Sequence, residues 1–165
     1  MKIYVASSWR NQFQQEVVGL LRAEGHEVYD FRGEGSGWND GGQGAGGFGW
    51  KEVDPEWQSW PDDIGRYIQG LNHPRAVEGF NRDMDALIKC DACVLVNPCG
   101  QSAHAELGWA CGAGKPAAVY CPAIREPDLM VMMADLVTDS WTAVCGWLKS
   151  LEEVSDALEE EIGAA

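Results

Sequence analysis

Residues 92–121 read ACVLVNPCGQSAHAELGWACGAGKPAAVYC, and this segment decides the fold. Ala92–Val96 is a short apolar run of the kind that forms a strand buried on both faces of a parallel sheet. A helix follows, with Ser102 as its expected N-cap, and the GAG segment at 112–114 ends it. A second buried strand is expected at Ala117–Cys121. The order strand, helix, strand predicts a right-handed crossover between parallel strands.

The same alternation extends toward both ends of the chain. Before this segment, Lys2–Ser7 and Glu27–Phe31 are expected strands, and Ser8 is the expected N-cap of the helix between them. After it, Leu136–Thr138 is an expected strand, and Ser140 caps a last helix. We therefore predict a single α/β domain spanning all 165 residues. Its expected architecture is a flavodoxin-like, doubly wound sheet of five parallel strands in three α/β/α layers.

An insert at about residues 32–61 interrupts this pattern. Between Gly33 and Gly49, nine of 17 residues are glycine. Four tryptophans lie within or just after this stretch: Trp38, Trp50, Trp57 and Trp60. A loop this long in a compact domain is usually either a functional lid or a disordered insertion. Two interpretations stay open: a flap whose tryptophans stack on a base or sugar, and a floppy insertion whose tryptophans pack locally or at a subunit contact.

Charge and composition exclude several classes of partner. With a formal net charge of −14 at pH 7, the chain is not expected to bind a nucleic-acid polymer or an anionic membrane. The start MKIYVASSWR is too short and too polar for a signal peptide, and no apolar run approaches the roughly 20 residues that span a bilayer. We expect a cytoplasmic protein whose six cysteines stay reduced. Cys90 and Cys93 form a CxxC pair without a second ligand pair, so we expect buried thiols rather than a zinc site.

Glu106 is a lone carboxylate near the start of the helix expected after Ser102. The partial positive charge at a helix N-terminus favours the ionised form of such a group by about 0.3–1 kcal/mol. Small neighbouring residues leave room for a ligand, and Trp109, three positions on, lies on the same side of the helix and can form a wall. His104 lies about 200° round the helix from Glu106, so we expect it to be a packing or surface residue.

Asp83 is the candidate for a second carboxylate at this site. It falls on the edge of the apolar arc of an earlier helix, whereas Asp85 faces away from that arc. Carboxylates act as nucleophiles where a sugar carbon develops oxocarbenium character, and a second acid then delivers a proton or orients the substrate. Glu106 and Asp83 are therefore a candidate catalytic pair. The alternative is that Glu106 is only a partner of the helix dipole.

The predicted sheet also indicates where a ligand binds. In doubly wound sheets the ligand lies beyond the carboxyl ends of the strands, where the first and third strands diverge. Glu106 falls at this crevice. The residues expected to line it are Ser7, Ser8 and Trp9 on one side, and Asn97 to Gly100 with the start of the next helix on the other.

Three segments of the chain resemble the nucleoside 2-deoxyribosyltransferase family, which includes related nucleoside-monophosphate N-glycosidases. They are YVASSWR at 4–10, FNRDMDALIKCDACVLV at 80–96 and SAHAELGWACGAGKP at 102–116. The most specific part is AELGWA with GKP behind it, and the spacing of Asp83 and Asp91 supports it. The resemblance runs in order from Lys2 to about Asp139 and excludes the insert.

This resemblance implies a flavodoxin-like enzyme that cleaves the N-glycosidic bond of nucleosides or nucleotides without a metal or organic cofactor. By matching position, Glu106 attacks C1′ of the sugar, and Asp83 is the acid near the departing base. Ser7 and Trp9 line the base or sugar pocket. Members of the family form dimers or larger assemblies whose sites a neighbouring subunit completes, which suits the LMVMM run at Leu129–Met133.

The chain also departs from the transferase pattern. Gly100 stands where typical transferases carry an aspartate that holds the base, and Ala6-Ser7-Ser8 replaces a glycine-rich turn. The hydrolase relatives bind a 5′-phosphate with serines near this helix start, a role open to Ser102 with Ser8 or Arg10. Three functions follow as alternatives: transfer to another base, hydrolysis, and a non-catalytic nucleotide sensor. A flavodoxin-like electron carrier is disfavoured, because no hydroxyl-rich phosphate loop of that type follows the first strand.

Overall fold

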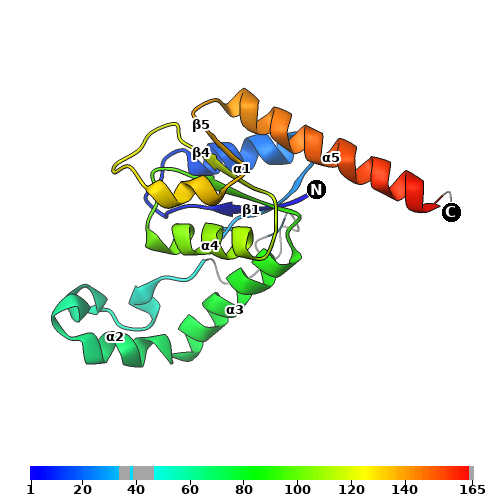
Figure 1. The fold of residues 1–165 in the computed structure, drawn as a ribbon. Coiled ribbons are helices and arrows are strands. Elements are labelled where there is room, and N and C mark those ends of the chain that lie inside the picture. Colours follow the sequence, from blue (N-terminus) through cyan, green and yellow to red (C-terminus); the bar gives the residue numbers. More distant parts are fainter. Residues whose placement is uncertain (34–37, 39–46, 164–165) are drawn as a thin grey trace.

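The computed structural model describes residues 1–33, 38 and 47–163, and in these it shows a five-stranded, all-parallel sheet (Figure 1). The strand order β2-β1-β3-β4-β5 confirms the flavodoxin-like prediction. The strands are β1 (Lys2–Ala6), β2 (Glu27–Tyr29), β3 (Ala92–Val96), β4 (Ala117–Tyr120) and β5 (Leu136–Thr138).

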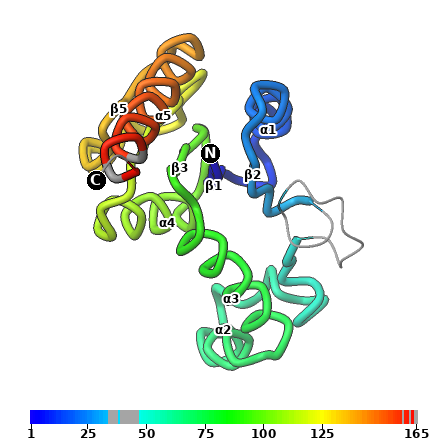
Figure 2. Tube along the Cα trace, turned by 90° about the vertical axis from the view of Figure 1, so that its right-hand side faces the viewer, coloured from blue at the N-terminus to red at the C-terminus, as the bar shows by residue number. Residues whose placement is uncertain are grey.

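Helices cover both faces of the sheet, which gives the predicted three layers (Figures 1 and 2). One face carries α1 (Gln14–Ala23) and α5 (Trp141–Gly163), and the other carries α3 (Pro74–Lys89) and α4 (Gln101–Gly112). Beyond α3, away from the sheet, lie the short turns η1 (Trp50–Glu52) and η2 (Trp57–Asp62) and the helix α2 (Ile64–Leu71). A further short turn, η3 (Leu129–Met133), precedes β5.

Side chains along β1 point alternately into two separate hydrophobic cores, one on each face of the sheet. Ile3 and Val5 belong to the apolar cluster under α1 and α5, whereas Tyr4 and Ala6 belong to the cluster under α3 and α4. Because successive strand residues point to opposite faces, a sheet covered on both sides needs apolar residues at every position. All five residues of β3 are buried for this reason. The carboxyl ends of β1 and β3 therefore sit on a rigid, fully packed base.

Two helix starts differ from the prediction. Ser8 does not cap α1, which begins only at Gln14; the Asn11 side chain accepts a hydrogen bond from the Phe13 amide just before it. At α4 the N-cap is Gly100, and Ser102 lies inside the first turn as an exposed residue. In both places the helix begins at a different residue than the serine predicts: α1 begins later in the chain, and α4 begins earlier.

A third capping prediction is confirmed at α5. The Ser140 hydroxyl accepts a hydrogen bond from the Ala143 amide at 3.3 Å. The helix that follows has 23 residues, but in the described part of the chain no helix is both long and apolar enough to cross a membrane.

The described part of the insert forms an aromatic cluster. Trp50 packs edge-on against Phe48, Trp60 and Tyr67, with ring centroids 4.8, 5.2 and 6.1 Å away. Tyr67 belongs to α2, a helix that we did not predict. These tryptophans pack locally, as one of the two interpretations expects. The glycine-rich part of the insert, residues 34–37 and 39–46, lies outside the described residues, so the flap stays a prediction.

All six cysteines are free in the structure. Both members of the CxxC pair, Cys90 and Cys93, are buried, as predicted. Burial raises the pKa of the Cys90 thiol to about 11, so that thiol is neutral near pH 7. Within residues 1–33, 38 and 47–163, no cluster of three or more metal-binding side chains is found.

Candidate active site

Glu106 of α4 lies near Asp83 of α3, Tyr4 in the middle of β1 and Tyr29 at the end of β2. Here "the crevice" means the place where these four side chains meet. Burial raises the pKa of Glu106 to about 8, and the negative charge of Asp83 adds to that rise. The nearby Tyr4 hydroxyl acts in the opposite direction. The crevice therefore holds Glu106 as a carboxylic acid near neutral pH.

Asp83 reaches the crevice from α3, half-buried as its position on the helix predicts, whereas Asp85 is exposed. Its Oδ1 accepts a hydrogen bond of 2.6 Å from the Tyr29 hydroxyl. Burial raises the pKa of Asp83, while this hydrogen bond and the charge of Arg82 lower it. Asp83 thus has two partners that favour its ionised form, and Glu106 has only one.

Tyr4 lies near Glu106, Tyr29 binds Asp83, and the two tyrosines lie side by side in the sheet. They are register partners in the parallel pair β1–β2, and their rings stack with centroids 5.0 Å apart and an interplanar angle of 13°. The Tyr4 hydroxyl is buried and has no hydrogen-bond partner of good geometry among the described residues. It is nevertheless near enough to Glu106 to lower the pKa of that carboxyl. This places the phenol beside the carboxyl, short of a fully formed hydrogen bond.

These contacts correct one expectation from the sequence. The helix N-terminus predicts an ionised Glu106, but burial and the charge of Asp83 outweigh that effect and raise the pKa of Glu106 to about 8. The order of ionisation follows from the same contacts. The Tyr29 hydrogen bond and the charge of Arg82 favour the ionised form of Asp83, whereas only the nearby Tyr4 hydroxyl favours that of Glu106, whose pKa is about 8. Asp83 therefore ionises first, and the remaining proton of the pair rests on Glu106.

The end of β1 is tied into the fold by hydrogen bonds. The Ser7 hydroxyl donates to the carbonyl of Val96 at 2.9 Å and accepts from the Asn11 amide at 2.9 Å. The Ser8 carbonyl accepts from the backbone amide of Asn11 at 2.9 Å and from the Arg32 guanidinium at 2.9 Å. The Ser7 bond joins the carboxyl ends of β1 and β3, and the Ser8 bonds hold the loop that follows β1.

Trp9 is the exposed aromatic surface at this end of the sheet, with 52% of its area accessible. Its ring packs edge-on against Phe31 at 5.5 Å, and Arg32 lies over the ring at 5.7 Å. A side chain at Gly47 would collide with the Phe31 carbonyl and with the Trp9 ring. The return of the insert therefore lies against Trp9 at a point where only glycine fits.

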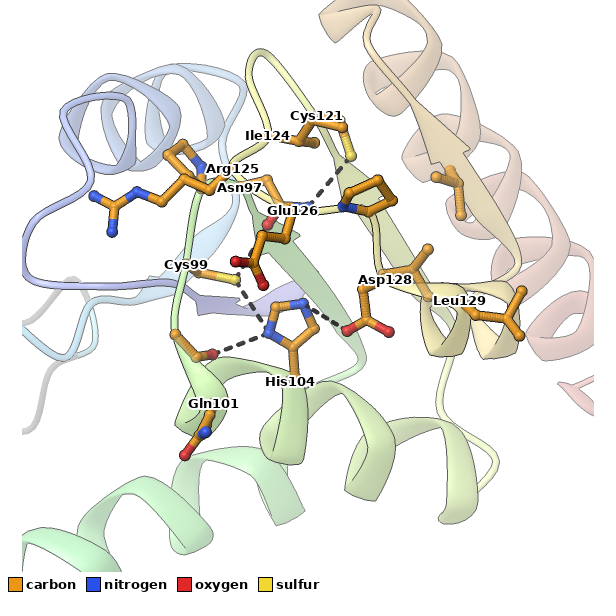
Figure 3. A pocket seen from close by; sticks show the side chains of 15 residues that line it. Asn97, Cys99, Gln101, His104, Cys121, Ile124, Arg125, Glu126, Asp128 and Leu129 are labelled. Carbon is orange, nitrogen blue, oxygen red and sulfur yellow. Dashed lines mark hydrogen bonds and ion pairs between the residues drawn. The ribbon is translucent and has the colours of Figure 1, made fainter.

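Asn97 and Gly100 lie at a separate opening on the far side of α4. This opening, called the hollow here, has a volume of about 810 Å³, and its walls include Asn97, Cys99, Gly100, His104 and Glu126 (Figure 3). Neither Glu106 nor Asp83 is among the residues that line it. The structure thus separates the predicted catalytic pair from Asn97 and Gly100.

His104 lies on the side of α4 away from Glu106, as its position on the helix predicts, and it lines the hollow. Its Nε2 lies 3.2 Å from an Asp128 carboxylate oxygen, and its Nδ1 lies 3.0 Å from the Gly100 carbonyl (Figure 3). Asp128 also caps η3 by accepting from the Met130 amide at 2.8 Å. His104 therefore connects the start of α4 to η3.

Ser102 and Trp109 stand apart from both openings. Ser102 is exposed and does not line the hollow. Trp109 is half-buried and packs against the core cluster that contains Tyr4. It lies on α4 one turn beyond Glu106, in the position expected for a wall.

Two residues of the crevice, Tyr4 and Tyr29, were not predicted, nor was the neighbouring Arg82. The two tyrosines look like core residues, because each lies in a strand of buried side chains. A signal was nevertheless present, since a phenol in a fully buried strand needs a polar partner for its hydroxyl. Arg82 adjoins Asp83 in sequence, and its charge lowers the pKa of both Tyr29 and Asp83.

Comparison with known proteins agrees with this fold. No protein-family model matches the chain, and no curated protein matches it by sequence. Among solved structures, the chain is similar to the 2-deoxyribosyltransferase of the psychrotolerant bacterium Bacillus psychrosaccharolyticus, with a TM-score of 0.58 and 20% identity. The match covers 87% of this chain and 90% of that one. The chain thus has the α/β fold of a 2-deoxyribosyltransferase, as the resemblance in its sequence implies.

Proposed function

We propose that this protein cleaves the N-glycosidic bond of a (deoxy)nucleoside or nucleotide through a covalent glutamyl–sugar intermediate. One observation carries the proposal. Two carboxyl groups from different helices, Glu106 and Asp83, lie close together, and each is near a tyrosine hydroxyl. A strongly raised pKa in one of two neighbouring acids is typical of sites that use one group as a base or nucleophile and the other as an acid.

The proposed reaction needs one carboxylate and one carboxylic acid. Glu106, as the carboxylate, attacks C1′ and forms an ester bond while the C1′–N bond breaks. The electron pair of that bond leaves with the base, which takes a proton from Asp83. In the second step, an acceptor base or a water molecule attacks C1′, its proton returns to Asp83, and Glu106 is released. All protons are exchanged within the pair and its substrates.

Two tryptophans support the proposal. Trp9 offers an exposed flat ring on which a base can stack, and Trp109 lies one turn from Glu106 on α4. Asn97 and Gly100 line the hollow on the other side of α4. We therefore keep Ser7, Ser8, Trp9, Asn97, Gly100, Ser102 and Trp109 as candidate substrate contacts.

We further propose that the protein works as a homodimer or a larger homo-oligomer. Two exposed apolar surfaces support this. One is η3, where Leu129 and Met132 are 74% and 76% exposed, and the other is the side of α2 that carries Ile64 and Ile68. Apolar residues gathered in this way on an acidic chain are typical of contact surfaces. A Leu129→Asp variant that sediments as a smaller species than the unchanged protein will support the assembly, and equal sedimentation of monomers will contradict it.

A panel of substrates tests the proposed activity. The protein is incubated with deoxynucleosides, ribonucleosides and their 5′-monophosphates, each with and without a different free base. A new nucleoside shows transfer, and release of the base alone shows hydrolysis; either result supports the proposal. Binding without turnover of any substrate shows the rival function, a nucleotide sensor, and contradicts it. The same panel separates nucleosides from monophosphates and ribose from deoxyribose.

A further inference from the structure

We propose that Tyr29 is a positioning residue that keeps Asp83 ionised in the free protein, so that the single proton of the Glu106–Asp83 pair rests on the nucleophile until substrate binds. The inference deepens the proposed function and depends on it for its catalytic meaning. Its structural content, the order in which the two carboxyls ionise, stands without any assumption about the substrate.

The geometry gives Tyr29 a fixed position. Tyr29 is the last residue of β2 and the register partner of Tyr4 in β1. The two rings stack, so the Tyr29 hydroxyl has little freedom to move. From there it donates to Asp83 Oδ1 at 2.6 Å, a length typical of a hydrogen bond to an ionised acceptor. A phenol that donates to a carboxylate stabilises the charged form of that carboxylate.

The other charged and titratable groups facing Asp83 act around this bond. Arg82, its neighbour on α3, also favours the ionised form. From α4 and β1, Glu106 and Tyr4 face the same space, and the charge of Asp83 makes ionisation of either one harder. Two buried carboxyls in one crevice do not both ionise readily, so stabilising the charge on one keeps the proton on the other.

In the resting state, therefore, Glu106 carries the proton and Asp83 is ionised. The reaction requires an ionised Glu106 and a protonated Asp83. Before attack, one proton must therefore move from the Glu106 carboxyl to the Asp83 carboxylate, with no net gain or loss of protons by the protein. A nucleoside that separates Asp83 from Tyr29 removes the bond that holds the resting state. The nucleophile then becomes active only when a substrate occupies the crevice.

Carboxyl titration by carbon NMR tests this directly in the free protein. Side-chain carboxyls are labelled, and Glu106→Gln and Asp83→Asn assign the two signals. In the unchanged protein, we expect Asp83 to ionise first and Glu106 last. In Tyr29→Phe, which keeps the stacked ring, the Asp83 midpoint should rise by about one to two pH units, the value of one hydrogen bond to a charged group. Tyr120→Phe, a matched removal of a hydroxyl that packs near Trp141 instead, should shift neither signal.

The outcomes separate the two proposals. If Glu106 ionises before Asp83 in the unchanged protein, or Asp83 has the same midpoint in Tyr29→Phe, the role of Tyr29 is wrong, even if nucleosides are turned over. If the midpoints shift as expected and the substrate panel shows no turnover, the role of Tyr29 stands and the proposed function fails. In an active protein, the acid limb of the pH–rate profile should move upward with the Asp83 midpoint. Should Tyr29→Phe not fold, the order of ionisation in the unchanged protein decides alone.

Discussion

The two sides of α4 treat an ionisable side chain in opposite ways. Toward α3, Glu106 is half-buried beside another acid, and its pKa is raised to about 8. Toward η3, only two positions earlier, His104 has an acidic partner, Asp128, at 3.2 Å and opens onto the hollow. A group with a matched partner stabilises the fold and resists change. A group whose pKa is strongly shifted is the one whose protonation state a bound substrate can change.

This difference shows why the larger opening need not contain the chemistry. The hollow has volume and polar walls, but its ionisable residues nearest α4 are already paired. The crevice is closed in by packed aromatic rings, and its carboxyl groups are not fully compensated. Shifted acids in a restricted space are the stronger indication of a reaction centre.

The largest expected effect comes from Glu106→Gln. The amide cannot attack C1′, so kcat/KM should fall by a factor of about 10³ or more, while the fold is retained. The matched control is Glu153→Gln, which changes an exposed residue of α5 and should leave kcat/KM unchanged within about twofold. Steady-state assays on the substrate found in the panel make the measurement. Equal loss in both variants would show that the effect is not specific to the crevice.

Asp83→Asn should have the next largest effect. Loss of the proton donor should lower kcat by a factor of about 10²–10⁴. Because the repelling charge is gone, the pKa of Glu106 should also fall, and the acid limb of any remaining activity, which then reports ionisation of Glu106, should lie at lower pH. Asp85→Asn, two residues away and facing solvent, is the control and should change neither quantity. Full activity of Asp83→Asn would show that Asp83 is not the proton donor.

Stability should depend on pH through Glu106. Its pKa is about 8 in the folded protein and near 4.5 in a free chain, so the folded state binds more protons between these values. The stabilisation is therefore complete below about pH 4.5 and is lost as pH rises through about 8. Denaturant unfolding of the unchanged protein should lose on the order of 1–3 kcal/mol from pH 5 to pH 8 relative to Glu106→Gln, which lacks this proton. A constant difference between the two proteins over this range would contradict the burial of an uncompensated acid.

The smallest effect is expected on the other side of α4. His104→Gln removes the ion pair with Asp128, which is partly exposed and should contribute less than about 1 kcal/mol to stability. Turnover should stay within about tenfold of the unchanged protein. The comparison is of kcat and of the thermal midpoint in the same preparation. A loss of turnover as large as that of Glu106→Gln would move the reaction centre to the hollow.

The sequence predicted most of the fold because the strands carry their signal locally. Ala92–Val96 and Leu136–Thr138 are found where expected, since an apolar run between turn residues has few other uses. The missed helix α2 and the displaced helix starts depend on how loops turn, which a serine or a tryptophan does not reveal by itself. The apolar residues of α2 do follow helical spacing: Ile64, Tyr67, Ile68 and Leu71.

The candidate site was only half predictable for a different reason. The positions of Glu106 and Asp83 follow from helix periodicity, which is local. Their charges follow from contacts between distant segments: Tyr29 is 54 residues from Asp83 and meets it only in the fold. The local field of a helix N-terminus predicted an ionised Glu106. The burial and the neighbouring acid that reverse this appear only when α3, α4 and β1 are packed together.

Trapping the intermediate tests the central claim most directly. The protein is mixed with a substrate from the panel in the absence of an acceptor base, quenched in acid, digested and examined by mass spectrometry. We predict one sugar residue attached to Glu106, formed as the base is released and absent from the Glu106→Gln variant. Release of the base with no sugar on the peptide that contains Glu106, or with the sugar on another residue, would contradict a glutamyl–sugar mechanism.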